Sequence, residues 1–516
     1  MDGATPTART WHRGWTRCGG AAGLLLLGLV VGGCANASAV MDFVARLLTS
    51  PRVAGWCHSP GGLETSSTRR SRRSGGAQER TGGASGTGYP RRLAGLAIAC
   101  GTLAVAACGS TSSSSALQPT PTAPAPVSAG TQLTPLAQAP GPVPAEYQTQ
   151  YASVEADAQA FEGMAGSPSS AGTTTVGAEL LAANGNIGTG LLSAHALSGV
   201  ETELDTYQAL GVQGVTVCVS FPLLLPSTTE SSGYLSFYEQ VAQQVQARGM
   251  VLSVEENPIF AGTQLTTLPI SYAGLTLDSY AAEQQQQAQL IIDDMKPAYL
   301  SLLTEPDTFS SVLHLDLDSP ATASQVVTEE LSGLNRGATL VGAGSGTWSS
   351  ISIDQALLAT PIDYLDVHVY PLAPADLTNL TSDVAAAKAA DRPLVMDETW
   401  LYKDLTDGNF GPAGTSQANA SGPENEMKDV SFSFWEPLDE SYVAAMVSYV
   451  RSQGFSYVAF FDGARCFFGY LTWSSELDAA SYPTFSQEYN QMVSANFAGP
   501  AVSGTGLRLQ QAIAGR

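Results

Sequence analysis

Two stretches of this chain end in the same way: Ala298-Tyr-Leu-Ser-Leu-Leu-Thr-Glu-Pro306 and Arg392-Pro-Leu-Val-Met-Asp-Glu-Thr-Trp400. Each is an apolar run of strand length that closes with a glutamate where a strand should give way to a loop. Enzymes built on parallel barrels keep their chemistry at the carboxyl ends of the strands. The two stretches therefore predict that Glu305 and Glu398 project into one active-site mouth.

Strand and helix signals alternate on both sides of these stretches. With the two stretches as the fourth and seventh strands, the other expected strands cover residues 173–181, 214–221, 250–255, 339–343, 364–370 and 457–461. Expected helices cover residues 198–210, 234–248, 278–296, 322–335, 353–358, 377–390, 438–453 and 485–496. This alternation predicts an α/β fold of the (β/α)8 TIM-barrel class. A doubly wound open sheet is the alternative, but no Gly-x-Gly-x-x-Gly opens a helix after the first strand.

The sixth expected strand carries polar residues on one face. In Leu365-Asp-Val-His-Val-Tyr-Pro371, the alternation of a strand places Asp366, His368 and Tyr370 on the same side. Barrel strands are largely apolar on both faces unless one end lines a site. We therefore expect this face to contribute to the mouth.

The glutamates lie in Thr304-Glu305-Pro306 and Asp397-Glu398-Thr399. In their strand positions these motifs resemble those of the clan of retaining β-glycosidases on (β/α)8 barrels, which includes endo-β-1,4-galactanases, β-mannanases and cellulases. The resemblance spans about residues 170 to 497 in order and spacing, with identity confined to a few positions. It implies that Glu305 is the acid/base and Glu398 the nucleophile of a double displacement, with carboxyls about 5 Å apart. It also implies that His368 or Tyr370 hydrogen-bonds the nucleophile.

One position departs from the clan's pattern. The clan has asparagine before the acid/base glutamate, where it touches the substrate, and this chain has Thr304. A hydroxyl donates a hydrogen bond but cannot copy the two-sided contact of an amide. The departure favours an alternative function, a barrel that binds a glycan or cell-wall component without cleaving it. A structural envelope protein is a third possibility.

Other residues compete for roles at the mouth. Asp397 would exchange places with Glu398 after a register error of one residue. Glu255-Glu256 is interpreted as a pair of loop carboxylates, and so is the glutamate of Trp435-Glu436-Pro437, although Glu256 or Asn257 could reach a sugar hydroxyl.

Aromatic side chains provide surfaces on which sugar rings stack. They gather after the seventh and eighth expected strands, at Trp400, Tyr402, Trp435, Phe467, Phe468, Tyr470 and Trp473. From this group we expect Trp400 and Trp435 to contact substrate, beside Thr304, His368, Tyr370 and Asn257.

The first 145 residues predict export rather than a folded domain. Two basic segments followed by short apolar runs end in Val31-Gly-Gly-Cys34 and Val105-Ala-Ala-Cys108. Both resemble the bacterial lipobox, and Cys108 is the stronger lipidation candidate because a Ser/Pro/Thr-rich stretch follows it. The expected organisation is a leader over 1–107, partly disordered or preceding the true start codon, a tether over 108–145, and the barrel domain over 146–516. We expect a membrane-anchored lipoprotein on the outer face of a bacterial membrane, or a secreted protein.

Charge and cysteine usage limit the partners. Residues 1–107 hold 12 of the 23 Lys+Arg and 4 of the 46 Asp+Glu, which leaves 11 basic and 42 acidic residues in the rest. Such an acidic domain repels phosphate backbones, so we expect no nucleic acid. The resemblance implies a carbohydrate substrate, and we expect a monomer. Cys218 and Cys466, the cysteines of the folded part, could pair or stay free. No zinc-ligand spacing occurs, so neither a metal nor a cofactor is expected.

Overall fold

The structure is a computed structural model of the chain. It describes residues 133–136, 139–165, 174–263, 266–370, 373–403, 430–461, 466–499 and 501–515. The predicted export signals, Cys108 and most of the predicted tether lie outside these ranges. Within them, no helix combines the length and the apolar character that crossing a bilayer requires.

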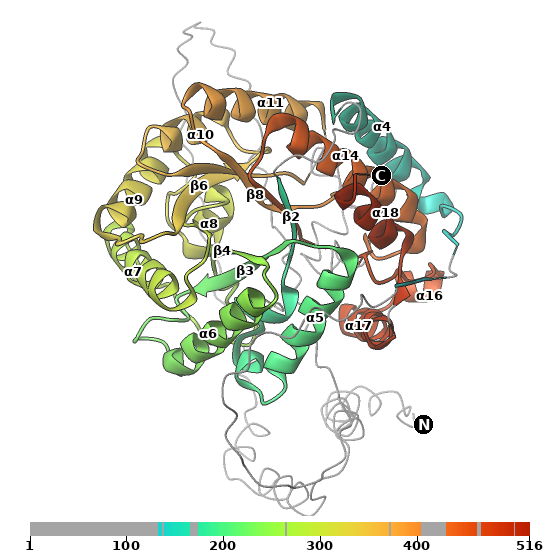
Figure 1. Cartoon of the computed structure of the whole chain (residues 1–516), viewed down its shortest axis with the longest axis horizontal. Coiled ribbons are helices and arrows are strands. Elements are labelled where there is room, and N and C mark those ends of the chain that lie inside the picture. Colours follow the sequence, from blue (N-terminus) through green and yellow to red (C-terminus); the bar gives the residue numbers. More distant parts are fainter. Residues whose placement is uncertain are drawn as a thin grey trace, which may run out of the picture. The chain divides into compact units, whose positions relative to one another are not determined.

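Eight parallel strands close into a barrel in sequence order, and they confirm the predicted (β/α)8 class (Figure 1). The last strand pairs with the first. The barrel strands are β2 (Thr175–Glu179), β3 (Gly214–Phe221), β4 (Val251–Pro258), β5 (Tyr299–Ser301), β6 (Leu340–Gly346), β7 (Tyr364–His368), β8 (Leu394–Thr399) and β9 (Tyr457–Phe460).

Helices surround the barrel in the order of the chain, as Figure 1 shows. They are α5 (Ala196–Leu210), α6 (Ser231–Ala247), α7 (Leu277–Leu290), α8 (Pro306–Leu313), α9 (Pro320–Gly333), α10 (Ile351–Leu358), α11 (Pro374–Ala389), α14 (Glu436–Gln453), α16 (Ser475–Asp478), α17 (Tyr482–Ala498) and α18 (Gly504–Ile513). Short helical segments add η1 (Ala145–Tyr147), η2 (Leu181–Ala183), η3 (Gly185–Leu192), the π-helix η4 (Ile291–Met295) and η6 (Ser433–Trp435).

Local signals explain where several helices begin and end. Thr276 caps α7 by accepting a hydrogen bond from the backbone of Ser279, and Ser319 caps α9 in the same way. Gly211 ends α5 with φ of 85°, a left-handed conformation that glycine adopts without steric cost. The predicted helix boundaries at these places are therefore close to the observed ones.

Two segments that the sequence assigned to loops belong to regular elements. Glu255 and Glu256 lie inside β4, which extends to Pro258, and Glu436 opens α14. Their interpretation as loop carboxylates was wrong. The sequence did not indicate that β4 continues through Glu255 and Glu256, because charged residues are rarely buried within a strand. Here both are at most 1% exposed.

Part of the predicted tether pairs with the domain. Strand β1 (Thr134–Pro135) forms a two-stranded parallel sheet with β10 (Ala501–Val502), at a place that the sequence assigned to the tether. Helix α4 (Gln148–Ala165), which the sequence did not predict, packs on α14. Because α4 buries only Val154, Ala158, Phe161 and Ala165, its periodicity is weak in the sequence.

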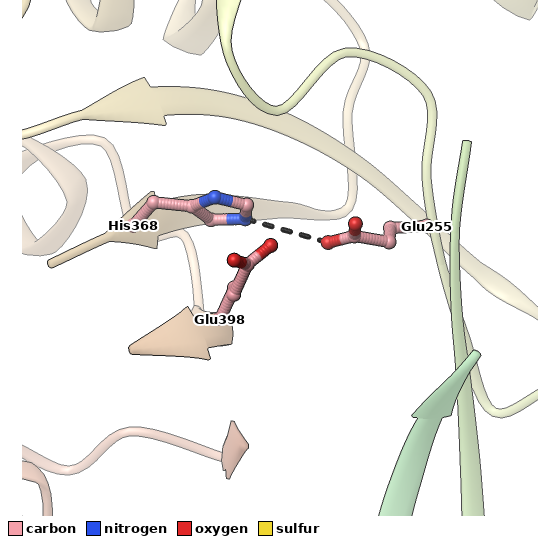
Figure 2. A group of neighbouring side chains, drawn as sticks. All are labelled: Glu255, His368 and Glu398. Carbon is pink, nitrogen blue, oxygen red and sulfur yellow. Dashed lines mark ion pairs between the residues drawn. The ribbon is translucent and has the colours of Figure 1, made fainter. Parts of the chain in front are cut away.

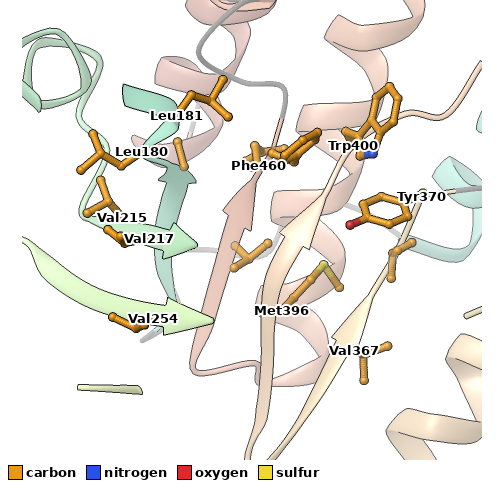
Figure 3. Packing of buried hydrophobic residues seen from close by; sticks show 14 of the residues in the cluster. Leu180, Leu181, Val215, Val217, Val254, Val367, Tyr370, Met396, Trp400 and Phe460 are labelled. Atoms are coloured by element: carbon orange, nitrogen blue, oxygen red, sulfur yellow. The ribbon is translucent and has the colours of Figure 1, made fainter. Parts of the chain in front are cut away.

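The main core lies between the barrel wall and the helices. Outward-facing side chains of successive strands fill it, including Val215, Val217, Val254, Val367 and Met396 (Figure 3). These residues alternate along each strand with side chains that enter the barrel. The outward-facing apolar side chains thus pack against the helices, and the inward-facing positions are available for polar residues.

Tyrosine rings close the amino-terminal end of the barrel. Tyr364 and Tyr457 are fully buried there with Val395, and Tyr299 packs against them with ring centroids 5.6 and 5.8 Å away. Glycine makes room for these rings, because a Cβ at Gly342 would lie 2.2 Å from the Tyr364 ring. The floor of the barrel is therefore a packed aromatic layer.

Candidate active site

Above the tyrosine floor, the barrel interior is polar. Asp397 accepts hydrogen bonds from Ser253 at 2.5 Å and from Ser301 at 2.6 Å, which come from β4 and β5 on other sides of the barrel. Its backbone N–H donates to Asp366 at 3.0 Å. The contacts place Asp397 deep in the barrel, where burial raises its pKa well above the ordinary value, and the charge of Asp366 raises it further.

An irregularity in β8 turns two neighbouring carboxylates inward. The pairing of β8 with β9 shifts register between Met396 and Thr399. Met396 packs in the outer core, and Thr399 donates to the Val369 carbonyl outside the barrel, whereas Asp397 and Glu398 both face the interior. A regular strand would have sent one of the two outward. The sequence left open which of the two residues lies at the mouth. Both face inward, and Glu398 lies nearer the mouth than Asp397.

Glu305 reaches the mouth from the turn after β5. It is the residue before Pro306, the first residue of α8, and its Oε2 accepts a hydrogen bond of 2.8 Å from Thr308. The proline fixes the start of the helix and thereby the direction in which Glu305 leaves the strand. Glu305 and Glu398 thus follow or end the fourth and seventh barrel strands, as the sequence predicted.

The polar face of the sixth barrel strand, β7, and of the residues after it holds Glu305. His368 Nδ1 lies 3.0 Å from Glu305 Oε1, and the Tyr370 hydroxyl donates to the same oxygen at 3.0 Å. These are contacts with the candidate acid/base. The clan resemblance implied a contact with the nucleophile, and Tyr370 makes this contact too, because a hydrogen bond with Glu398 helps to raise the pKa of the phenol. Glu398 is near enough to Tyr370 that it also contributes to the raised pKa of the phenol, after burial and the charge of Glu305.

A third glutamate, Glu255, faces the candidate pair. One ligand atom each of Glu255, His368 and Glu398 lie within 4.8 Å of one another, and all three residues are buried. Figure 2 shows the carboxylate of Glu398 pointing towards the space between His368 and Glu255. His368 Nε2 is 3.6 Å from Glu255 Oε2, and the other oxygen of Glu255 accepts a hydrogen bond of 2.6 Å from the Cys218 thiol.

Burial dominates the electrostatics of these carboxylates. It raises the pKa of Glu255 to about 7, against the lowering effects of His368 and the Cys218 hydrogen bond. It also raises the pKa of Glu398 well above the ordinary value, and the charges of Glu255 and Glu179 add to this while His368 opposes it. Burial thus favours the neutral forms of Glu255 and Glu398 in the free site.

His368 supplies positive charge to the cluster. Burial alone would lower its pKa, but Asp366, whose Oδ2 lies 3.3 Å from Nε2, and Glu305 reverse this and raise the pKa well above the ordinary value. In the described part of the chain, no lysine or arginine contacts Glu255, Glu305 or Glu398. The imidazole is thus the local group that favours ionised carboxylates.

The other predicted residues lie at different distances from this centre. Thr304 is buried beside Glu305, and Asn257 is buried in β4, where it donates to Cys218 Sγ at 2.7 Å. The Trp400 ring lies 6.0 Å from that of Tyr370. Trp435 is not brought to the mouth, because it is fully buried and its ring stacks on Tyr151 of α4 at 5.3 Å.

Sequence reasoning missed two residues of the mouth. Glu255 was set aside as a loop carboxylate, although its place between the polar Ser253 and Asn257 at alternate positions marked an inward face. Trp348, which follows β6, stacks on Tyr370 with ring centroids 4.8 Å apart and donates to Asp307 at 3.0 Å. Its partial exposure makes it an aromatic surface near Glu305.

Both cysteines of the described region are buried, and Cys218 is a free thiol. Cys218 lies in the barrel interior, and burial raises its pKa well above the ordinary value, with the charge of Glu255 adding to this. A protonated thiol is a poor nucleophile, so Cys218 is a hydrogen-bond donor to Glu255 rather than a reactive group.

Comparisons with known proteins give neighbours but no family. No protein-family model matches the chain, and no curated protein sequence matches it. A variant of GH5_18 from Streptomyces cattleya, solved in complex with Manβ1-4GlcNAc, is similar with a TM-score of 0.41 and 15% identity over 66% of this chain and 80% of that one. GH5_18 from Bifidobacterium longum gives a TM-score of 0.43 and 12% identity over 66% and 79%.

The exo-β-1,4-mannosidase Op5Man5 from Opitutaceae bacterium strain TAV5 gives a TM-score of 0.40 and 14% identity over 63% of this chain and 60% of that one. The structural neighbours are thus glycoside hydrolases. Likeness at this level does not transfer their activity, and the functional argument below depends on the site itself.

Proposed function

We propose that this chain is a glycoside hydrolase that cleaves a β-linked glycan with retention of configuration. The observation that carries the proposal is the placement of Glu305 and Glu398 after or at the ends of the fourth and seventh barrel strands, on either side of one buried imidazole. A retaining glycosidase needs two carboxyls at one mouth in different protonation states.

In the proposed mechanism, Glu398 attacks the anomeric carbon while Glu305 gives its proton to the leaving oxygen. Water then hydrolyses the glycosyl-enzyme, with Glu305 acting as base. Burial opposes the ionisation of Glu398, and the cationic His368 favours it. Because burial favours the neutral form of Glu255, the charge that would otherwise repel an ionised Glu398 is reduced. The Tyr370 hydroxyl and His368 orient Glu305 for proton transfer.

The test is hydrolysis by the full chain of a panel of β-linked polysaccharides and aryl β-glycosides. We expect one class of sugar to be cleaved, and NMR of the first product to show the β-anomer before mutarotation. An α-anomeric first product would contradict retention. The same panel names the sugar.

A glycan-binding barrel without hydrolysis is the second candidate. Thr304 in place of an asparagine and the raised pKa of Glu398 favour it, because both weaken the case for an ionised nucleophile beside a fully bound sugar. Retardation of the chain in a glycan-containing gel without release of reducing sugar would support this candidate over the enzyme.

We also propose that the protein is exported and anchored through a lipid on Cys108. The support is the pattern Val105-Ala-Ala-Cys108 followed by a serine-rich stretch. In bacterial cells expressing the full chain, labelled fatty acid is expected to enter the wild type and not Cys108→Ser. Equal labelling of the two proteins would remove the proposal.

A further inference from the structure

Three buried ligand atoms in the mouth converge, and none makes a well-aligned hydrogen bond, although His368 Nε2 also lies 3.3 Å from Asp366 Oδ2. They are Glu255 Oε2, His368 Nε2 and Glu398 Oε1, and each belongs to a residue that is 1% exposed. A buried polar atom without a partner costs free energy, so such atoms are satisfied when a further group binds. Since three of them lie within 4.8 Å of one another, a single small ligand can satisfy all three.

We propose that Glu255, His368 and Glu398 bind one divalent transition-metal ion, of the zinc class. Two carboxylate oxygens and one imidazole nitrogen are a donor set that zinc accepts, with a fourth position left for water. The imidazole ligand argues against magnesium and calcium, which prefer oxygen alone. The proposal differs from the expectation, drawn from sequence spacing, that the protein holds no metal.

The surroundings of His368 support this choice of ligand atom. Its other nitrogen, Nδ1, lies 3.0 Å from Glu305 Oε1, the arrangement in which a carboxylate fixes the tautomer of a metal-binding histidine. Because the free site favours the imidazolium form of His368, binding of the ion displaces the Nε2 proton to solvent and leaves the Nδ1 proton on the Glu305 side. Figure 2 shows this edge of the ring turned towards Glu255.

The strands hold the three ligands in fixed positions. Glu255 and Glu398 lie within β4 and β8, and His368 ends β7, so the ligands come from rigid elements. Cys218 fixes the remaining oxygen of Glu255. In a site held this way, little conformational freedom is lost when the ion binds.

Zinc uptake by the metal-free full chain tests the proposal without any substrate. In equilibrium dialysis followed by metal analysis, we expect an equivalent of Zn²⁺ that Glu255→Gln and Glu398→Gln each bind at least about 10-fold more weakly, because each loses a charged ligand. Cysteines elsewhere in the chain could also hold zinc, but neither substitution would change that uptake. Mg²⁺ and Ca²⁺ at the same concentration should not compete.

Glu256→Gln is the matched control, because Glu256 is an equally buried neighbour in β4 that faces the other way and accepts a hydrogen bond from Gln287 at 3.0 Å. It should bind zinc as the wild type does. Glu305→Gln removes the carboxylate behind the histidine and should weaken binding by about 10- to 100-fold. Absence of the equivalent in the wild type, or its full retention in both ligand variants, would overturn the site. Failure to cleave any glycan would leave these results unaffected.

Discussion

Glu398→Gln is expected to lower kcat/KM for the cleaved glycan by on the order of 10⁴-fold or more, since the loss of a covalent nucleophile removes the pathway that it opens. Glutamine has the shape of glutamate, and the site already favours a neutral group at this position because burial raises the pKa of Glu398. The variant should therefore fold as the wild type does, which a thermal melt would check.

The small-anion experiment identifies the role of Glu398. In Glu398→Ala, azide can enter the space that the side chain leaves and attack the anomeric carbon from the same side. We expect partial recovery of activity and a glycosyl azide of inverted configuration. A fall in kcat/KM of less than about 10-fold in Glu398→Gln would contradict the assignment. Other inward carboxylates, such as Glu255 and Asp397, would then be the candidates for the nucleophile.

Glu305→Gln is expected to have an effect that depends on the leaving group. For a glycan or an alkyl glycoside, which needs a proton on its leaving oxygen, kcat/KM should fall by about 10² to 10⁴-fold. For an aryl glycoside with a strongly acidic phenol, the first step needs no proton, so kcat/KM should stay near the wild-type value. Turnover should then be limited by slow hydrolysis of the glycosyl-enzyme, with an initial burst of phenol.

Measured kcat/KM values across a series of phenols would show this difference as a steeper dependence on phenol pKa than in the wild type. Glu256→Gln again serves as the control, since its side chain faces away from the mouth. An equal loss for all leaving groups would mean that Glu305 has a structural or binding role instead.

Much of the fold followed from periodicity. The valine-rich run around Val217 predicted a barrel strand, and the alternating Asp366, His368 and Tyr370 predicted a strand with a polar face at the mouth. The ordinal positions of Glu305 and Glu398 followed from counting these strands. Counting strands could not show which of Asp397 and Glu398 lies nearer the mouth, because both face inward only through an irregular pairing of β8 with β9.

The partners of the glutamates were also outside the reach of sequence. Contacts between Glu255 and His368 join residues on different strands, and a single sequence contains no record of such proximity. Trp435 shows the opposite error, since its place among the aromatic residues after the seventh expected strand suggested the mouth. Helix α4, which sequence periodicity did not indicate, covers it instead.

The tyrosine layer at the base of the barrel determines from which end a ligand can reach the carboxylates. Tyr364 and Tyr457 pack across the amino-terminal end of the barrel, so Glu255 and Glu398 lie towards the opposite end. If the proposed function holds, a glycan approaches Glu305 and Glu398 from the carboxyl ends of the strands and does not pass through the barrel. In that case the product leaves by the same end at which the substrate enters, so product release precedes binding of the next substrate.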